Sequence, residues 1–247
     1  MKTNSFENPT IVSPEKWLAA RRELLREEKE FTKLRDRVAQ RRREFPRVRV
    51  AQPYTFDSPG GRVSLADLFE GRSQLIVQHF MLGAGWEEGC KACSFMLDHI
   101  NPTVPHLNAR DVSFAAISHG PLAEILPFKA RMGWAVNWVS SHDTDFNFDF
   151  HVSFTEKELA GGTVNYNYTQ REFPCEEAPG LSVFARDAAG TVYHTYSTYG
   201  RGVEVVMGTY HLLDLVPKGR GEDAEAPSKW MRHHDNYGQP ADALATH

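Results

Sequence analysis

Four large apolar residues recur at seven-residue intervals near the start of the chain, namely Trp17, Leu24, Phe31 and Val38. Intervals of seven place side chains on one side of an α-helix, and the residues between them are mostly charged. Ser13 followed by Pro14 is a typical helix start, because Ser caps the first turn and Pro fits the first helical position. We therefore expect a long amphipathic N-terminal helix that ends near Arg43.

Beyond this helix, short apolar runs alternate with helical patterns. The run 75–82 is continuously apolar apart from Gln78 and His79, as is typical of a strand covered on both faces. The next helical pattern should bend, because two prolines follow it closely. The expected strands are 75–82, 111–118 and 137–140, and the expected helices are 94–100 and 121–132. This alternation predicts an α/β fold with a sheet flanked by helices.

The last third of the compact region has a different pattern. Residues 141–177 are rich in Asn, Asp, Phe and Tyr without periodicity, and they suggest a long surface insertion with one short helix near 155–159. Two β-rich runs, 181–186 and 191–197, surround a short turn with a glycine and predict an antiparallel hairpin. Residues 201–215 then predict a helix whose apolar positions cover one face of the sheet.

Composition bounds the organisation of the chain. Its 247 residues are 41% apolar, enough for one sizeable core plus extensions. We expect an N-terminal helical arm over 1–49, an α/β domain over 50–216 and a polar C-terminal extension over 217–247. The net charge of −4 gives no general attraction to nucleic acid or anionic lipid. Residues 14–49 alone hold 13 Lys and Arg against 7 Asp and Glu, so the positive charge is concentrated in the arm.

Targeting signals and cysteine content indicate the compartment. Residues 1–7 contain no apolar core of a signal peptide, and no segment approaches the roughly 20 apolar residues of a membrane span. Three cysteines in a chain of this length cannot form the disulfide framework of a small secreted domain. We expect a cytoplasmic protein with no membrane partner.

Two of the cysteines, Cys90 and Cys93, are separated by two residues between an apolar strand pattern and a helix pattern. A helix that begins at Cys90 directs free backbone N–H groups and its positive dipole end at that sulfur, which favours the thiolate. Dithiol redox chemistry is therefore the leading hypothesis, with a protein or a small-molecule disulfide as substrate and no cofactor. The third cysteine, Cys175, has too little local context to be assigned a role.

The same spacing also provides half of many zinc sites. No second closely spaced pair completes a tetrahedron, so a metal would have to recruit distant histidines such as His79, His99 or the pair at 233–234. A metal-binding or metal-delivery protein that uses both thiolates and one histidine is the alternative. No metal ligand is expected at the site.

Two further residues are candidates for substrate binding. Trp86 precedes Cys90 by four residues and could form an apolar wall beside the site, although an aromatic residue that merely anchors the loop fits as well. Pro179 stands just before the expected hairpin, where a cis bond would leave a backbone edge free to pair with a substrate. Most X-Pro bonds are trans.

The long N-terminal helix has three interpretations. It could pack on its own domain, form a homodimer with a second copy, or bind nucleic acid through Arg41, Arg42 and Arg43. The last is the weakest, because such charge runs are usually solvated faces. A non-catalytic interaction protein, with this helix as its functional surface, is a further alternative to an enzyme.

The order of elements resembles the thioredoxin-like fold over about residues 50–215. More narrowly, several runs resemble the bacterial DUF899 family: 79–81, 89–94, 131–134, 145–149, 194–197 and 212–220. That family is often labelled as a predicted dithiol-disulfide oxidoreductase. The resemblance implies Cys90 as the attacking thiol, Cys93 as the resolving thiol and Pro179 as a candidate cis-proline.

Peroxiredoxins are similar in fold but carry a Thr three residues before the cysteine that reacts with peroxide. Glu87 occupies that position in this chain. Without the hydroxyl group that binds peroxide, peroxide reduction by that mechanism is disfavoured.

Overall fold

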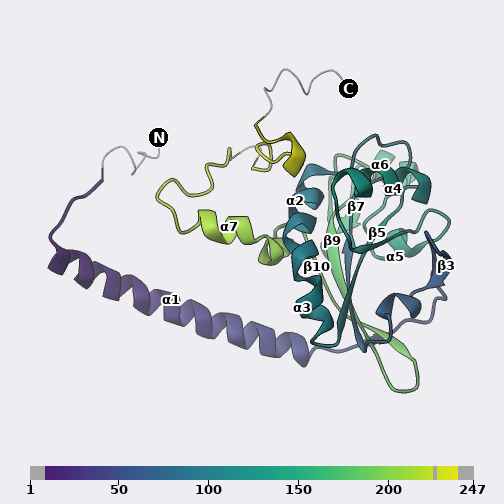
Figure 1. The fold of residues 1–247 in the computed structure, drawn as a ribbon, viewed down its shortest axis with the longest axis horizontal. Helices are drawn as coiled ribbons and strands as arrows, with labels where there is room; N and C mark the ends of the chain where they lie inside the picture. Colours follow the sequence, from purple (N-terminus) through teal and green to yellow (C-terminus); the bar gives the residue numbers. More distant parts are fainter. Residues whose placement is uncertain (1–8, 225–226, 239–247) are drawn as a thin grey trace.

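The structure, a computed structural model, describes residues 9–224 and 227–238. Within these residues, an eight-stranded mixed sheet lies at the centre, in the order β1-β10-β9-β4-β5-β6-β2-β3, and β7 pairs separately with β8 (Figure 1). The strands are β1 (Val48–Arg49), β2 (Thr55–Ser58), β3 (Gly61–Ser64), β4 (Gln74–His79), β5 (Val112–Ser118), β6 (Asn137–Ser140), β7 (Val164–Tyr166), β8 (Thr169–Arg171), β9 (Gly180–Arg186) and β10 (Val192–Tyr199).

Helical segments flank both faces of this sheet. The α-helices are α1 (Pro14–Arg43), α2 (Lys91–Ile100), α3 (Val104–Asn108), α4 (Leu122–Arg131), α5 (Phe146–Asp149), α6 (Glu156–Ala160) and α7 (Gly208–Leu213). The 3-10 segments are η1 (Asp67–Phe69), η2 (Asn101–Thr103), η3 (Gly200–Val206) and η4 (His234–Asn236). The predicted break after the second helix is confirmed, since α2 ends at Ile100 and Pro102 lies in η2.

Strand β5 shows why the centre of the sheet is buried on both sides. Phe114 and Ala116 belong to a core cluster with α2 and α4, whereas Ala115 and Ile117 belong to a cluster with η1 and α5. Alternate residues of a strand point to opposite faces, so a continuously apolar strand needs cover on both. The strands predicted from the apolar runs are confirmed.

The strand order confirms the thioredoxin-like fold. Strands β4 and β5 are parallel and are connected through α2, and β9 lies antiparallel to β4 on its other side and continues into β10. The predicted hairpin is therefore confirmed. At the end of β4, His79 is paired with Ile117 of β5 and with Gly180 of β9, so the loop after β4 emerges beside the start of β9.

The segment 141–177 differs from the surface insertion expected from its polar composition. Phe146 and Val152 are fully buried, and Tyr166 is almost so. The short helix is confirmed as α6, which Thr155 and Glu158 begin with a reciprocal capping box. The aromatic residues of this segment pack against the sheet and into a small cluster of their own. The sequence did not predict this burial, because the segment has no hydrophobic periodicity.

Helix α1 projects away from the sheet as an arm (Figure 1). None of its side chains is buried, and Trp17 and Phe31 are 59% and 67% exposed. Near its C-terminal end, the Arg42 guanidinium lies 5.1 Å from the ring centre of Tyr196. The helix is confirmed, including the Ser13 cap that accepts the N–H of Lys16, but packing on its own domain is wrong.

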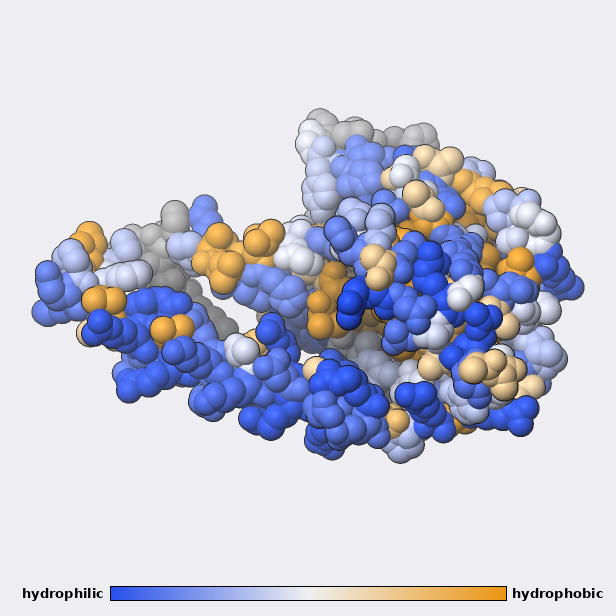
Figure 2. Space-filling view, turned by 60° about the horizontal axis from the view of Figure 1, so that its bottom comes forward, coloured by the Kyte–Doolittle hydropathy of each residue, from blue (hydrophilic) through white to orange (hydrophobic). Residues whose placement is uncertain are grey.

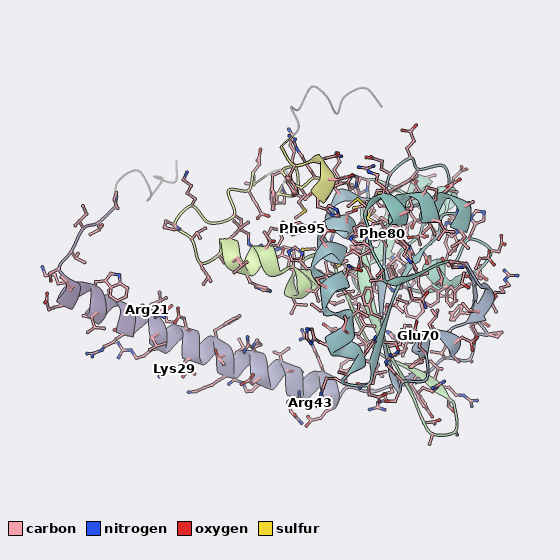
Figure 3. All side chains as sticks on the ribbon, in the orientation of Figure 1. Arg21, Lys29, Arg43, Glu70, Phe80 and Phe95 are labelled. Atoms are coloured by element: carbon pink, nitrogen blue, oxygen red, sulfur yellow. The ribbon has the colours of Figure 1, made fainter. Side chains whose placement is uncertain are left out.

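The surface of α1 is mostly hydrophilic and is interrupted by apolar residues (Figure 2). Basic side chains such as Arg21, Lys29 and Arg43 are distributed along its length (Figure 3). Within the described residues, no helix combines the length and the apolar character needed to cross a membrane. The expectation for residues 1–7 lies outside the described part of the chain.

The helix predicted over 201–215 is instead two segments, η3 and α7, joined at Met207. Val203 and Tyr210 are buried against α2, whereas Val205 and Leu212 are 58% and 66% exposed. The prediction that Val205 and Leu212 cover the sheet is therefore wrong. A 3-10 segment has fewer residues per turn than an α-helix, so the side chains point in other directions than in one continuous α-helix.

Candidate active site

The loop between β4 and α2 is held by close packing and hydrogen bonds. A Cβ atom on Gly89 would lie 2.5 Å from a Phe80 ring carbon and 2.6 Å from a Phe128 ring carbon, so only glycine fits without a shift. The next residue, Cys90, donates its backbone N–H to the carbonyl of Met81 at 3.0 Å. This close approach fixes the position at which α2 begins.

Helix α2 starts at Cys90, which is its N-cap. The Cys90 sulfur accepts the backbone N–H of Cys93 at 3.5 Å, and the Ser94 hydroxyl donates to the Cys90 carbonyl at 2.9 Å. Behind the first turn, the buried Gln78 side chain donates to the Cys93 carbonyl at 3.0 Å. The predicted helix start at the first cysteine is confirmed.

The two cysteines, both free thiols, have opposite electrostatic environments. Cys90 is half-buried, and its hydrogen bond with the Cys93 side chain, helped by backbone N–H groups of Ala92 and Cys93, lowers its pKa to about 7. Cys93 is only 1% exposed, and burial raises its pKa, with the neighbouring Cys90 adding to the effect. At neutral pH Cys90 therefore has a substantial thiolate fraction, whereas Cys93 is a buried thiol.

Trp86 lies in the loop before Cys90 and is half-buried against the same core cluster as the Cys90 side chain. Its indole N–H donates to Glu176 at 2.7 Å. Trp86 therefore packs against the same core as the dithiol and is held in place from the segment before β9, which is consistent with either a wall or an anchor.

Pro179 is brought next to the dithiol, and it lines the same cavity as Cys93. Within the described residues no peptide bond is cis, so the expectation of a cis bond at Pro179 is wrong. Its carbonyl accepts the hydroxyl of the buried Tyr166 at 2.7 Å. The backbone that a cis bond was expected to free is thus partly engaged within the protein.

A buried carboxyl group, Glu177, was missed by the sequence analysis. It is 2% exposed, accepts the Ser153 hydroxyl at 2.8 Å and lies 3.5 Å from the His119 ring nitrogen Nδ1. Burial raises the pKa of Glu177, and its charge is one of the influences that raise the pKa of Cys93. A glutamate in an aperiodic polar segment gave no signal that it would be buried.

Cys175 lies two residues before Glu177, and its thiol donates to the Glu177 carbonyl at 3.2 Å. Burial raises the pKa of Cys175, and the charge of Cys90 adds to the effect. The third thiol is therefore in the neighbourhood of the dithiol but is mainly protonated at neutral pH.

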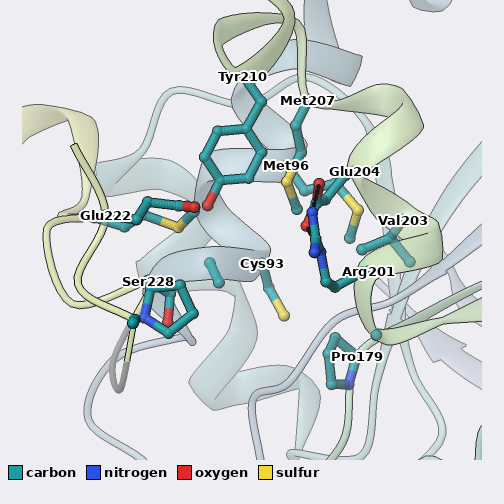
Figure 4. A pocket seen from close by; sticks show the side chains of 15 residues that line it. Cys93, Met96, Pro179, Arg201, Val203, Glu204, Met207, Tyr210, Glu222 and Ser228 are labelled. Carbon is teal, nitrogen blue, oxygen red and sulfur yellow. Dashed lines mark hydrogen bonds and ion pairs between the residues drawn. The ribbon is translucent and has the colours of Figure 1, made fainter. Parts of the chain in front are cut away.

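A cavity of about 450 Å³ opens beside Cys93, and Figure 4 shows the Cys93 sulfur directed toward it. Its wall combines α2, Pro179, η3, α7 and the C-terminal segment. The lining residues are Ala92, Cys93, Met96, Pro179, Gly200, Arg201, Val203, Glu204, Met207, Tyr210, Glu222, Ala224, Pro227, Ser228 and Met231. This cavity could not be predicted from the sequence, because its wall is built from segments far apart in the chain.

The C-terminal segment expected to be polar and loop-like returns to the site. Met231 and His233 are buried, and the His233 side chain donates to the Gly89 carbonyl at 2.8 Å. Arg131 of α4 pairs with Asp235 at 2.8 Å. The described part of this segment therefore packs against the start of α2 and against α4.

The histidines considered as metal ligands have other partners. His79 interacts with Ser182 at 2.7 Å, His99 with Thr209 at 2.7 Å, and His233 with Gly89. Within residues 9–224 and 227–238, no group of three or more His, Cys, Asp and Glu side chains is arranged to hold a metal ion.

Residues 6–237 match the family described as "Bacterial protein of unknown function (DUF899)". The chain belongs to this family. No curated protein matches the sequence of this DUF899 member.

Solved structures with a similar fold include two peroxiredoxins. Peroxiredoxin Q of Xanthomonas campestris is 14% identical, with a TM-score of 0.45 over 68% of this chain and 95% of that one. Peroxidoxin BcpB of Mycobacterium tuberculosis is 11% identical, with a TM-score of 0.45 over 67% of this chain and 95% of that one. The thioredoxin-like assignment rests on the strand order.

Proposed function

We propose that this DUF899 member is a thiol-disulfide oxidoreductase in which Cys90 attacks and Cys93 resolves. The observation that carries the proposal is the asymmetry of the pair. Cys90 is half-buried at a helix N-terminus with a pKa lowered to about 7, and Cys93 is a buried thiol one turn away. A thiolate near neutral pKa combines a substantial ionised fraction with good nucleophilicity.

The reaction proceeds by two exchanges. The Cys90 thiolate attacks one sulfur of a substrate disulfide, and the other sulfur leaves as a thiolate that takes up a proton. Cys93 then loses its proton and attacks the Cys90 sulfur, which releases the second substrate thiol and forms the Cys90–Cys93 disulfide. Two electrons pass from the dithiol to the substrate, and no bound cofactor is required.

The second exchange needs a proton acceptor, because burial keeps Cys93 protonated. Glu177 fits this role, since it is a buried carboxyl whose own pKa is raised and whose charge acts on Cys93. His119, 3.5 Å from Glu177 and 22% exposed in its side chain, connects that carboxyl to the surface. In this scheme Glu177 takes the proton of Cys93 and His119 helps to return it to solvent.

Trp86 and Pro179 complete the substrate-binding surface of the proposal. Trp86 is half-exposed beside Cys90, and Pro179 faces the cavity next to Cys93. A reduced dithiol suits a reducing compartment, so the cytoplasm is the proposed location.

Trapping tests this function. A Cys93→Ser variant mixed with bis(2-hydroxyethyl) disulfide should accumulate a mixed disulfide at Cys90, observed by intact mass and peptide mapping. The wild type should instead form the Cys90–Cys93 disulfide, and Cys175→Ser should behave like the wild type. Absence of the Cys90 adduct, or failure of the pair to oxidise over a wide range of redox buffers, would contradict the proposal.

We also propose that α1 assembles the protein into a homodimer. Its apolar stripe is exposed from Trp17 to Val38, although a 30-residue helix in water gains most of its stability from packing. A second copy supplies a surface of complementary charge, since residues 14–49 carry +6 and the rest of the chain −10. Leu212 and Leu215 of one copy, 66% and 80% exposed, offer apolar surface for the arm of the other.

A further inference from the structure

The cavity beside Cys93 has the composition of a binding site for an apolar group. Three methionines, Met96, Met207 and Met231, line it together with Val203 and the Tyr210 ring (Figure 4). Methionine side chains are unbranched and polarisable, so they adapt to apolar ligands of different shapes. The volume of about 450 Å³ lies within the range of small-molecule sites in proteins, roughly 300–1,000 Å³.

The shape of the cavity favours a small molecule over a protein chain. Ser228 lies on one side of it, Arg201 and Val203 of η3 lie on the other, and Cys93 of α2 lies between them (Figure 4). A folded protein substrate would need an open groove along the dithiol. A cavity lined by several separate segments of the chain instead offers a small ligand contacts on more than one side.

The charges at the edge of the cavity are already paired. Arg201 pairs with Glu204 at 2.8 Å, and Arg220 pairs with the same Glu204 at 2.9 Å. The Tyr210 hydroxyl forms a hydrogen bond with Glu222. An apolar ligand leaves these pairs intact and gains from burial.

We propose that this cavity binds the apolar substituent of a small-molecule disulfide, which makes such disulfides the substrates of the dithiol. This inference rests on the proposed exchange function. The cavity adjoins Cys93, the residue that resolves the mixed disulfide, so a substituent held there keeps the substrate next to the pair during both exchanges. The products are two thiols, one of them with the apolar group, and the oxidised pair.

A series of dialkyl disulfides from diethyl to dibutyl tests the inference. In the wild type, kcat/KM for oxidation of the dithiol should rise about threefold to fourfold for each methylene added per chain, because each buried methylene contributes a constant increment. Ser228→Trp, at an exposed lining position, should abolish this rise. Lys229→Trp, next to it but outside the lining, is the matched control and should retain the rise.

Bis(2-hydroxyethyl) disulfide separates the two proposals, because it has no long apolar group. Its rate should be the same in the wild type and in Lys229→Trp, whose changed residue lies outside the lining. If it reacts but the dialkyl series shows no dependence on chain length, the cavity inference is wrong and the exchange function stands. If it does not oxidise the pair, the exchange function is wrong.

Binding of 1-octanol, which cannot react with thiols, tests whether the cavity binds an apolar group without any thiol-disulfide exchange. A ligand of the folded state raises the melting temperature, so 1-octanol should stabilise the wild type and Lys229→Trp but not Ser228→Trp. Circular dichroism of the three proteins checks that each is folded. An equal shift in all three, or none in the wild type, would overturn the inference.

Discussion

The sulfur of Cys90 accepts the backbone N–H of Cys93 at 3.5 Å, and this contact ties the ionisation of one cysteine to the position of the other. The Cys93 side chain makes the largest contribution to the lowered pKa of Cys90. Cys93 is itself kept protonated by burial. The two thiols are therefore not equivalent. Cys90 ionises first, and Cys93 stays protonated.

The reactivity of Cys90 should follow its lowered pKa. The rate of alkylation of Cys90 by iodoacetamide should be half-maximal near pH 7, because the thiolate is the reacting form, and below that pH it should fall about tenfold per unit. In Cys93→Ala the midpoint should move to higher pH, since the main stabilising contact is lost. Peptide mapping after timed alkylation measures both curves. A wild-type midpoint near the ordinary thiol value of about 8.5 would contradict the assignment.

Loss of the Glu177 carboxylate should slow the second exchange and spare the first. In Glu177→Gln, resolution of a preformed mixed disulfide at Cys90 should slow by about 100-fold, a typical effect of removing a general base. Quenched-flow mass spectrometry separates the two steps. Glu176→Gln, an exposed neighbour that contacts Trp86, is the control and should resolve at the wild-type rate. Equal rates in both variants would exclude Glu177 as the acceptor.

The packing around Gly89 predicts a local cost for any side chain. Gly89→Ala should lower the free energy of unfolding by about 1–3 kcal/mol, because Phe80 and Phe128 must move to admit the methyl group. At Gly60, where the closest atom to a Cβ is 3.9 Å away, the same change should stay within about 0.5 kcal/mol. Urea denaturation measures both. An unchanged free energy of unfolding in Gly89→Ala would show that the Phe80 and Phe128 rings can move aside without cost.

The exposed stripe of α1 predicts an assembly that one charge can disrupt. The wild type should have twice the chain mass of 28.0 kDa by light scattering after size exclusion, and Phe31→Glu should be monomeric. Thr32→Glu adds the same charge at an exposed polar position next to it and should remain dimeric. A monomeric wild type would refute the homodimer, and a dimeric Phe31→Glu would place the contact elsewhere.

The sequence predicted the elements whose signal is local. The apolar run before the cysteines, the start of α2 at Cys90 and the hairpin β9-β10 all depend on neighbouring residues, and each is confirmed. The arm was predicted as a helix for the same reason. Its environment was not, because heptad spacing shows that a face is apolar without showing what covers it.

The features that the sequence did not predict depend on contacts between residues far apart in the chain. His233 and Gly89 are 144 positions apart, and neither residue type indicates the other. Glu177 lies in a segment of polar composition, yet the aromatic residues around it draw that segment into the fold. The bond before Pro179 is trans, although the resemblance implied a candidate cis-proline. That expectation came from the fold, because local sequence alone favours a trans bond.

The hydrogen bond from His233 to Gly89 also bears on when the protein becomes competent during its synthesis. Chains emerge from the ribosome with the N-terminus first, so the sheet and α2 are complete before His233 exists. Until the segment with Met231 and His233 arrives, the first turn of α2 lacks one of its walls and the dithiol stays open to water. Chains cut short before this segment would thus carry both cysteines beside a cavity that lacks the wall formed by Ser228 and Met231.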